Sequence, residues 1–416
     1  MSSIFLVVFG LIGFSFGWFV YSKFIAEKIY RLDPNYVTPA HRVNDGIDYV
    51  PTNKFVLWGA HFTAVAGAAP IVGPAAAVYY GWVPAVLWVV LGSIFFAGVH
   101  DMGALWASNR HGAKSPVAIG IGVLIRRQFN LLVISLIGVG LLYFSIWVGS
   151  EYPLALPGDI FGLGANGNWI ILLFVYAGIA SMLPVWLLLQ PRDYINGAQL
   201  VLGLLVLYSA VFITLPDVTA PAFNSVAEGT PPIWPILFVT IACALSGFHG
   251  IVSSGTSSKQ LDNEKDARFV GYLGALGEGS LALITIVAVT GSLYAASGAD
   301  WNAVYTGLSS GPGQEGFIEG GAHLIHEGWG FSLAFSETML AVMVVLFAGT
   351  TMDAGLRLQR YIIQEWGNIY DIEPLKNNVF STLLAIAACL ALAFGVTNSN
   401  YENLGDGGML IWPVFG

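Results

Sequence analysis

Residues 54–81 read KFVLWGAHFTAVAGAAPIVGPAAAVYYG. The stretch is apolar and long enough to cross a bilayer, whose hydrocarbon core needs about 20 helical residues. Two glycines and two prolines interrupt it near its middle, namely Gly67, Pro70, Gly73 and Pro74. Proline removes a backbone donor and clashes with the preceding turn, and lipid tolerates such a break only where protein buries it or where it lines a cavity. We interpret the stretch as a broken transmembrane helix at a transporter's substrate site, with His61 upstream. The alternative is an ordinary proline kink in a helix bundle.

The composition is that of a polytopic membrane protein. Of the 416 residues, 56% are hydrophobic and only 10% are charged, whereas soluble domains carry about 25% charged residues. The sequence contains no metalloprotease, thiol-redox or serine-hydrolase motif and no basic aromatic patch for nucleic acid. We therefore expect neither an enzyme nor a nucleic-acid partner, and no cofactor. Cys243 and Cys389 lie in apolar segments and are interpreted as core residues.

Ten segments are apolar and long enough to cross the membrane as helices. They cover residues 3–22, 55–80, 83–108, 130–149, 168–190, 194–215, 233–257, 268–296, 329–352 and 378–397. The first follows no positive charge and ends in no clean cleavage site, so we expect a retained helix rather than a signal peptide. Residues 115–127 are predicted to form a short helix that does not cross, and residues 405–416 to begin an eleventh element.

The basic residues define an orientation. All 16 lysines and arginines fall in the loops after the first, third, fifth, seventh and ninth spans, while the loops on the other side carry only acids. Lysine and arginine accumulate on the cytoplasmic side of membrane proteins. We therefore predict a multi-pass protein with its N-terminus outside.

A second broken segment suggests an internal repeat. Gly247, Gly250 and Gly255 weaken the span at 233–257, and His249 lies in its middle. Two broken helices, five spans apart and opposite in direction, are typical of inverted five-helix repeats. We predict a single transmembrane domain over residues 1–416. In it the first helix is accessory, residues 54–215 form the first repeat, and residues 233–416 form a second repeat that is incomplete at its C-terminal end.

Few ionisable residues lie within the spans. An unpaired charge there costs several kcal/mol, so each is a candidate functional residue, although a polar pair that fixes helix packing is the alternative. We assign His61 and His249 to substrate binding. The candidates for proton coupling are His100, Asp101, Glu278, Glu337 and Asp353. Asp353 has an alternative role as the ion-pair partner of Arg357, one helical turn later.

Histidines also raise the question of a metal. Neutral imidazole is a common metal ligand, so a membrane metalloprotein built on His61, His100 and His249 is the alternative reading, although we expect no metal. His323 and His326 are interpreted as part of a solvated external loop.

Several stretches resemble one family. They are TPAHRVNDGIDYVPTNK (38–54), HFTAVAGAAPIVGP (61–74), FAGVHD (96–101), TIACALSGFH (240–249), SGT (254–256), DARFVGY (266–272), TTMD (350–353) and WPVFG (412–416). In this order they resemble the carbon starvation protein A family of bacterial inner-membrane transporters. The resemblance implies import of pyruvate or small peptides during nutrient limitation, and kinship with the leucine-transporter-like superfamily.

Two departures from that family stand out. Members continue past the WPVFG motif with more membrane helices, whereas this sequence stops inside it. We expect a truncated chain, or a member whose remainder lies elsewhere. In addition, Ala69 stands where the family has glycine, which removes some backbone freedom at the break.

These observations lead to an all-α secondary transporter with inverted five-helix repeats, and the resemblance implies that its fold is leucine-transporter-like. We expect a small carboxylate substrate between the two broken spans, on residues His61, Gly67, Pro70, Gly73, Gly247, His249, Ser253, Ser254 and Thr256. Proton coupling is favoured, and sodium held by Thr350 and Thr351 is the alternative. The expected partners are the substrate, membrane lipid and the coupling ion, with a homo-oligomer or a membrane complex left open. A non-transporting subunit of such a complex is the rival function.

Overall fold

A computed structural model gives the architecture. It describes residues 1–46, 48–112, 131–152, 163–185, 189–225, 248–292, 301–307 and 313–395, with single positions at 187, 230, 233 and 311. The named elements are all helices, as expected for an all-α membrane protein.

Six helices of the described part are long and apolar enough to span a membrane. They are Ile4–Ile29, Trp82–Arg110, Leu189–Thr214, Arg268–Gly291, Leu333–Ile369 and Asn378–Gly395. Two further expected spans appear as α8 (Leu131–Glu151) and α9 (Gly164–Met182). The expected span 233–257 lies mostly outside the described residues, as do Cys243, the short helix at 115–127 and the tail at 405–416.

The broken helix is confirmed. It consists of α4 (Lys54–Ala66) and α5 (Ala69–Ala77), which continues to Tyr80, and the two halves meet at 45°. Gly67 ends α4 at φ +50°, a conformation that glycine adopts readily. The carbonyl of Ala64 near the break is not left free, because the Thr351 hydroxyl donates a hydrogen bond to it at 2.9 Å. A neighbouring helix thus compensates the interrupted backbone, as membrane burial requires.

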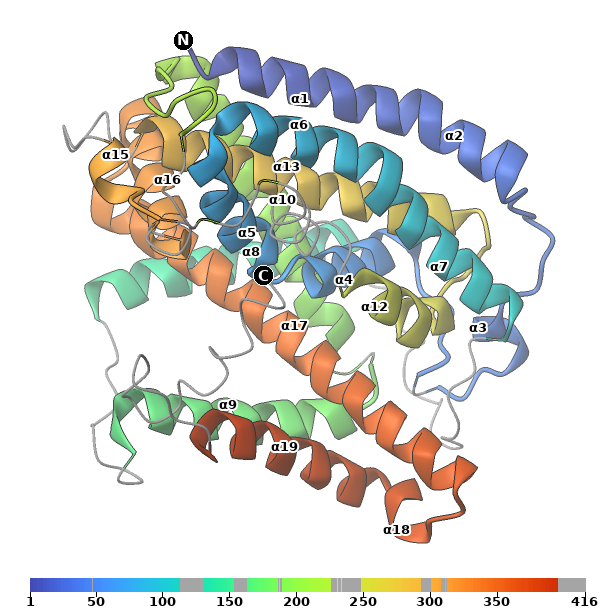
Figure 1. Ribbon diagram of the computed structural model, residues 1–416. Coiled ribbons are helices and arrows are strands. Elements are labelled where there is room, and N and C mark those ends of the chain that lie inside the picture. The colour runs from blue at the N-terminus through green and yellow to red at the C-terminus, as the bar shows by residue number, and fades with distance from the viewer. Residues whose placement is uncertain are drawn as a thin grey trace.

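The helix at Arg268–Gly291, which contains α13 (Leu273–Val287), forms the centre of the bundle. In its apolar window 83% of residues are buried, against 28% for the first helix at Ile4–Ile29. Figure 1 shows that first helix, labelled α1 (Ile4–Phe16) and α2 (Ser22–Phe24), lying along the outside of the bundle. The difference places α13 where buried polar groups can meet and leaves α1 facing lipid.

Glycines allow the closest helix contacts. Helix α10 (Leu189–Thr214) packs against α4. A Cβ on its Gly197 would lie 2.8 Å from the Cα of Gly59. Small residues of this kind let backbones approach closely in membrane bundles.

Some expected boundaries were wrong. Helix α17 (Leu333–Ile369) runs well beyond residue 352, so Arg357 and Arg360 lie in a helix and not in a loop. Helix α9 ends at Met182 rather than near residue 190, and α10 begins at Leu189. Hydropathy misplaced the end of α17 because a helix can continue beyond its apolar segment. It misplaced the end of α9 because Leu183, which precedes Pro184, is extended and stops the helix although the sequence stays apolar.

The expected external loop around His323 and His326 is also wrong. Both residues lie in α16 (Gly313–Trp329), which packs on α10 and α17. Its five glycines argue against a helix by propensity. However, its apolar face of Phe317, Leu324 and Ile325 is fully buried, and such tertiary packing overrides propensity.

Candidate functional site

Asp101 is the centre of a buried polar cluster. It lies in α7 (Gly98–Arg110), and its Oδ2 is 3.1 Å from Nε2 of His61 in α4 and 2.9 Å from Nδ1 of His249. His249 is the first residue of α12 (His249–Gly255), and Ser253 of the same helix donates a hydrogen bond to Asp101 Oδ1. The side chains of Asp101 and both histidines are fully buried. One carboxylate therefore joins three separate helices.

The cluster continues from both histidines. Nδ1 of His61 is 2.8 Å from the Ser257 hydroxyl. Nε2 of His249 makes an ion-pair contact with Glu278 of α13, whose side chain is also fully buried. We name these six residues the histidine–carboxylate cluster: His61, Asp101, His249, Ser253, Ser257 and Glu278. It forms a continuous line of polar groups from Ser257 to Glu278.

Glycines of the central helix make room for this cluster. A Cβ on Gly274 would lie 3.0 Å from Cδ2 of His61. A Cβ on Gly271 would lie 2.8 Å from the backbone nitrogen of Met102, next to Asp101. The sequence around Gly271 and Gly274 thus lets α4 and α7 close onto the helix that carries Glu278.

The chemistry available to the cluster is proton exchange. His249 lies between two carboxylates, those of Asp101 and Glu278. A proton gained by any of the three groups therefore changes the proton affinity of the other two, and they titrate as a unit. Each imidazole can donate through one nitrogen and accept through the other. Buried charges are tolerated only when they are paired, and the pairing here is made of groups that can lose or gain a proton.

A second group of charges surrounds Arg192 at the start of α10. Its guanidinium contacts Asp193 at 2.6 Å and also pairs with Asp353 of α17. The hypothesis that Asp353 pairs with Arg357 is therefore wrong. In the next turn of α10, the Asn196 amide donates to the Thr350 hydroxyl at 3.2 Å. Asp353 thus belongs to an ion-pair network outside the histidine–carboxylate cluster.

Arg357 instead belongs to a third group, which the sequence reasoning missed. Its guanidinium donates to Asp48 Oδ1 at 2.9 Å and to the carbonyl oxygen of Ala180 at 2.9 Å. The ammonium of Lys259 lies 3.7 Å from the centre of the Tyr361 ring, a cation–π contact. We name this group the cation cluster: Asp48, Lys259, Arg357, Arg360 and Tyr361, all of them buried.

The charges of the cation cluster shift the pKa values of its loop residues. Burial alone would raise the pKa of Asp48, but Arg357 and then Lys259 outweigh it and hold that pKa below its usual range. Burial lowers the pKa of Lys259 to about 8, against the pull of Asp48 in the other direction. The one signal in the sequence was two arginines at helical spacing directly after an apolar segment.

Two of the predicted proton-coupling residues lie elsewhere. His100 is exposed and faces α12, where a Cβ on Gly250 would be 3.0 Å from its Cε1. Glu337 is half-buried and lines a separate cavity of about 590 Å³ with Glu315 and Glu319. Neither residue joins the histidine–carboxylate cluster.

The predicted substrate residues are only partly brought together. His61, His249 and Ser253 meet at Asp101. Gly67 instead lies at the break between α4 and α5, and Pro70 and Gly73 lie within α5. The Thr256 hydroxyl donates to the Val252 carbonyl of its own segment at 3.0 Å. Gly247 lies outside the described residues.

Ser254 lines a cavity beside the histidine–carboxylate cluster. The cavity has a volume of about 670 Å³ and lies between α7, α12 and α17. Its walls include Ser108, Gly250, Ser254, Tyr361 and Glu365. Because Gly250 follows His249 directly, the cavity begins one residue away from the cluster.

A three-histidine metal centre is not assembled. Within the described ranges, no group of three or more His, Cys, Asp or Glu side chains is arranged to hold a metal ion. His61 and His249 share Asp101, but His100 is exposed on another side of α7.

Comparison with known proteins places the chain in a family. The family model described as "Carbon starvation protein CstA" matches residues 2–120, 115–301 and 296–416. A peptide transporter CstA of Campylobacter jejuni is 32% identical, covering 100% of this chain and 74% of the relative. A peptide transporter CstA of Helicobacter pylori is 30% identical, with 100% and 75% covered. The pyruvate/proton symporter BtsT of Escherichia coli is 29% identical, again with 100% and 75% covered.

These alignments contain internal gaps. The match to the Campylobacter protein extends over 524 positions, although this chain has 416 residues. The relatives therefore carry internal segments that this chain lacks. The matches nevertheless run from one end of the sequence to the other, and so include every residue of the histidine–carboxylate cluster. The chain belongs to the carbon starvation protein CstA family.

Proposed function

We propose that this protein is a proton-coupled importer of a small carboxylate nutrient, either pyruvate or a short peptide. It would act in the cytoplasmic (inner) membrane of a bacterium, with its N-terminus outside. The names of the relatives support this substrate class, since they include peptide transporters and a pyruvate/proton symporter. The observation that carries the proton coupling is Asp101, fully buried between two histidines of different helices.

In the proposed cycle, Asp101, His249 and Glu278 hold the transported proton. An ionised Asp101 holds His61 of the broken helix α4 and His249 of α12 at the same time. Protonation of Asp101 removes charge from both hydrogen bonds, and charge-assisted hydrogen bonds are about twice as strong as neutral ones. Weaker hydrogen bonds would release α4 from α12. The pair of helices would then have two states, held together and released, and coupling needs such a two-state element.

The substrate carboxylate would bind near the break of the first repeat. Within Gly67–Gly73, Pro70 has no N–H, and the N–H groups of Ile71 and Val72 donate to the Ala68 carbonyl. The carboxylate would therefore bind the backbone N–H groups just before Pro70, at the start of α5, where the helix dipole favours a negative charge. Gly247 and His249 would complete the site from the second broken segment. The cavity lined by Ser254 would form the cytoplasmic part of the path. This arrangement makes protonation and substrate binding act on the same pair of helices.

The test is uptake in proteoliposomes. Labelled pyruvate and labelled dialanine are offered separately, first with an imposed proton gradient and then with a sodium gradient. We expect proton-driven accumulation of one of them. Accumulation that follows the sodium gradient alone would contradict the proposed coupling and favour an ion site at Thr350 and Thr351.

The matched variants are His249→Gln and His326→Gln. His326 is exposed and contacts the backbone carbonyl of Phe331, so its replacement should leave uptake unchanged. His249→Gln should abolish accumulation against the gradient. Unchanged coupling in folded His249→Gln would contradict the role of this cluster, and absent uptake by the folded wild-type chain would favour the subunit reading.

A further inference from the structure

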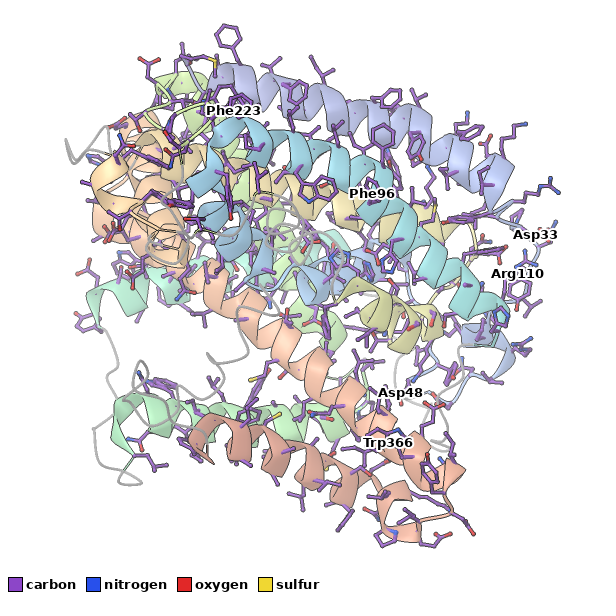
Figure 2. All side chains as sticks on the ribbon, in the orientation of Figure 1. Asp33, Asp48, Phe96, Arg110, Phe223 and Trp366 are labelled. Carbon is purple, nitrogen blue, oxygen red and sulfur yellow. The ribbon has the colours of Figure 1, made fainter. Side chains whose placement is uncertain are left out.

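Two adjoining cavities lie where the first helix ends. Their volumes are about 740 and 560 Å³, and they share Pro34, Lys265 and Arg268 in their walls. Figure 2 shows Asp33 and Arg110 beside one another at this end of the molecule. Both cavities are on the side where the sequence places its lysines and arginines. We name the pair the basic cavity. It lies at the Arg268 end of the helix Arg268–Gly291, several turns before Glu278, and the proposed transport cycle makes no use of it.

Positive charge exceeds negative charge in the walls. Six cations line the basic cavity: Lys23, Arg31, Lys54, Arg110, Lys265 and Arg268. Three acids line it with them: Glu27, Asp33 and Asp266. Arg110 is neutralised by the buried Glu264, to which it donates two hydrogen bonds at 2.5 and 2.7 Å.

Three lysine ammonium groups in the walls are not used in ion pairs within the described protein. Within the described part of the chain, Lys23, Lys54 and Lys265 form no ion pair. Lys23 and Lys265 are exposed, while Lys54 lies over the Phe269 ring at 5.4 Å. Lys23 and Lys265 are therefore directed to solvent or to a ligand, whereas the charge of Lys54 also acts on the carboxyl of Asp266 in the same wall.

The walls are fixed before any ligand arrives. The backbone N–H of Asp33 donates to Glu264 at 2.6 Å, and the Asn263 amide donates to the Pro34 carbonyl at 3.1 Å. Arg268 donates to the Ser22 hydroxyl at 2.9 Å, and its guanidinium lies over the Trp18 ring. Such contacts hold the two loops and the first helix in one arrangement, which lowers the entropy cost of binding.

The surroundings favour a lipid over a soluble anion. The first helix has an outward apolar face next to the cavity, where Phe19 is 69%, Val20 56% and Phe24 51% exposed. Trp18 and Phe269 line the smaller cavity beside the cations, and aromatic rings of this kind are enriched at headgroup depth. A molecule with a negative head and apolar chains matches both the cavity and the face.

We propose that the basic cavity binds the phosphodiester headgroup of an anionic phospholipid, with the acyl chains along the exposed face of the first helix. Basic pockets between transmembrane helices on the cytoplasmic side are suited to such headgroups. Lys23 and Lys265 would contact the phosphate from opposite walls, and Lys54 would extend the site into the smaller cavity. The site would belong to the leaflet on the side of the lysines and arginines.

Lipid retention tests the proposal without a transport assay. The full chain is purified from nanodiscs of mixed phosphatidylglycerol and phosphatidylcholine, and bound lipid is counted by native mass spectrometry. We expect phosphatidylglycerol to be retained selectively. The variant Lys23→Gln/Lys265→Gln should weaken that retention by about fivefold for each lysine removed. A charge-matched control, Lys28→Gln/Arg42→Gln, removes two exposed cations outside the cavity and should retain lipid as the wild type does.

Three results would overturn the proposal. Equal losses in the two double variants would show that only the overall charge of this side matters. Equal retention of phosphatidylcholine would remove the role of the cations. Displacement of the lipid by millimolar inorganic phosphate, with phosphate left bound, would identify a site for a soluble anion. Elution of each variant as a folded monodisperse species is required before lipids are counted. If the lysine pair prevents folding, Lys54→Gln alone carries the same comparison.

Discussion

The histidine–carboxylate cluster and the cation cluster are both buried, and both connect segments that are distant in the sequence. The first joins His61 to Ser257, and the second joins Asp48 to Arg357. They differ in the cation that is used. Histidine changes its charge near neutral pH, whereas arginine stays charged at every pH a cell meets. The comparison suggests that charge changes in the histidine–carboxylate cluster, whereas the Arg357–Asp48 pair of the cation cluster keeps a permanent charge and holds the fold.

The largest stability effect should come from the permanent pair. Arg357→Ala leaves Asp48 buried without its cation, and breaking a buried pair in this way costs about 3–5 kcal/mol of unfolding free energy. Denaturant unfolding in detergent measures the loss. The control is Arg42→Ala, an exposed arginine, whose effect should stay within about 0.5 kcal/mol. Equal effects of the two substitutions would remove the structural role of the cation cluster.

The second-largest expected effect is a pH dependence of the unfolding free energy, caused by Lys259. In the unfolded chain this lysine keeps its proton up to its ordinary pKa of 10.5, whereas in the folded chain its pKa is about 8. The unfolded state therefore binds more protons between these values, so the free energy of unfolding should rise with pH across that window. The rise attributable to Lys259 is at most about 3 kcal/mol. Lys259→Met should remove it, and the measurement is the difference between the two pH profiles.

Asp101→Asn should impair transport more than it lowers stability, whereas Arg357→Ala should act mainly on stability. Asparagine keeps the size of the side chain and an acceptor oxygen, so we expect a loss of only about 1–3 kcal/mol in unfolding free energy. It cannot take up a proton, so proton-driven accumulation should disappear while substrate exchange at equilibrium continues. Glu327→Gln, which changes an exposed acid of α16, is the control. An Asp101→Asn protein that still concentrates substrate would break the comparison.

The smallest effect concerns the end of the cluster. Ser257→Ala removes the hydroxyl next to Nδ1 of His61 and leaves Asp101 in place. We expect a loss of about 0.5–1.5 kcal/mol, together with a shifted pH dependence of uptake. Ser145→Ala, which removes a hydroxyl bonded only within its own helix, should shift neither quantity. A pH profile of Ser257→Ala that coincides with the wild type would limit the cluster to Asp101, His249 and Glu278.

Local sequence was sufficient to predict part of the fold and part of the candidate site. The break at Gly67 followed from glycine and proline in an apolar segment, and the rarity of charge in the spans singled out Asp101, His249 and Glu278. The pairings were out of reach, because Arg357 and Asp48 are 309 residues apart and nothing local selects one partner over another. The same holds for Asp353, whose nearest cation in the sequence is Arg357 but whose partner is Arg192. The inverted repeat and the substrate residues stay predictions.

The length of α17 has a mechanical consequence. Its 37 residues form a rod of about 55 Å, and a bilayer's hydrocarbon core is about 30 Å thick. The rod carries Glu337 near one end, Thr351 against the break of α4 in its middle, and Arg357 further on. In Figure 1 it crosses the whole molecule and is followed by α18 (Glu373–Lys376) and α19 (Asn378–Gly395). A tilt of a few degrees about the contact of Thr351 with the break would therefore move the two ends of α17 in opposite directions, as in a lever.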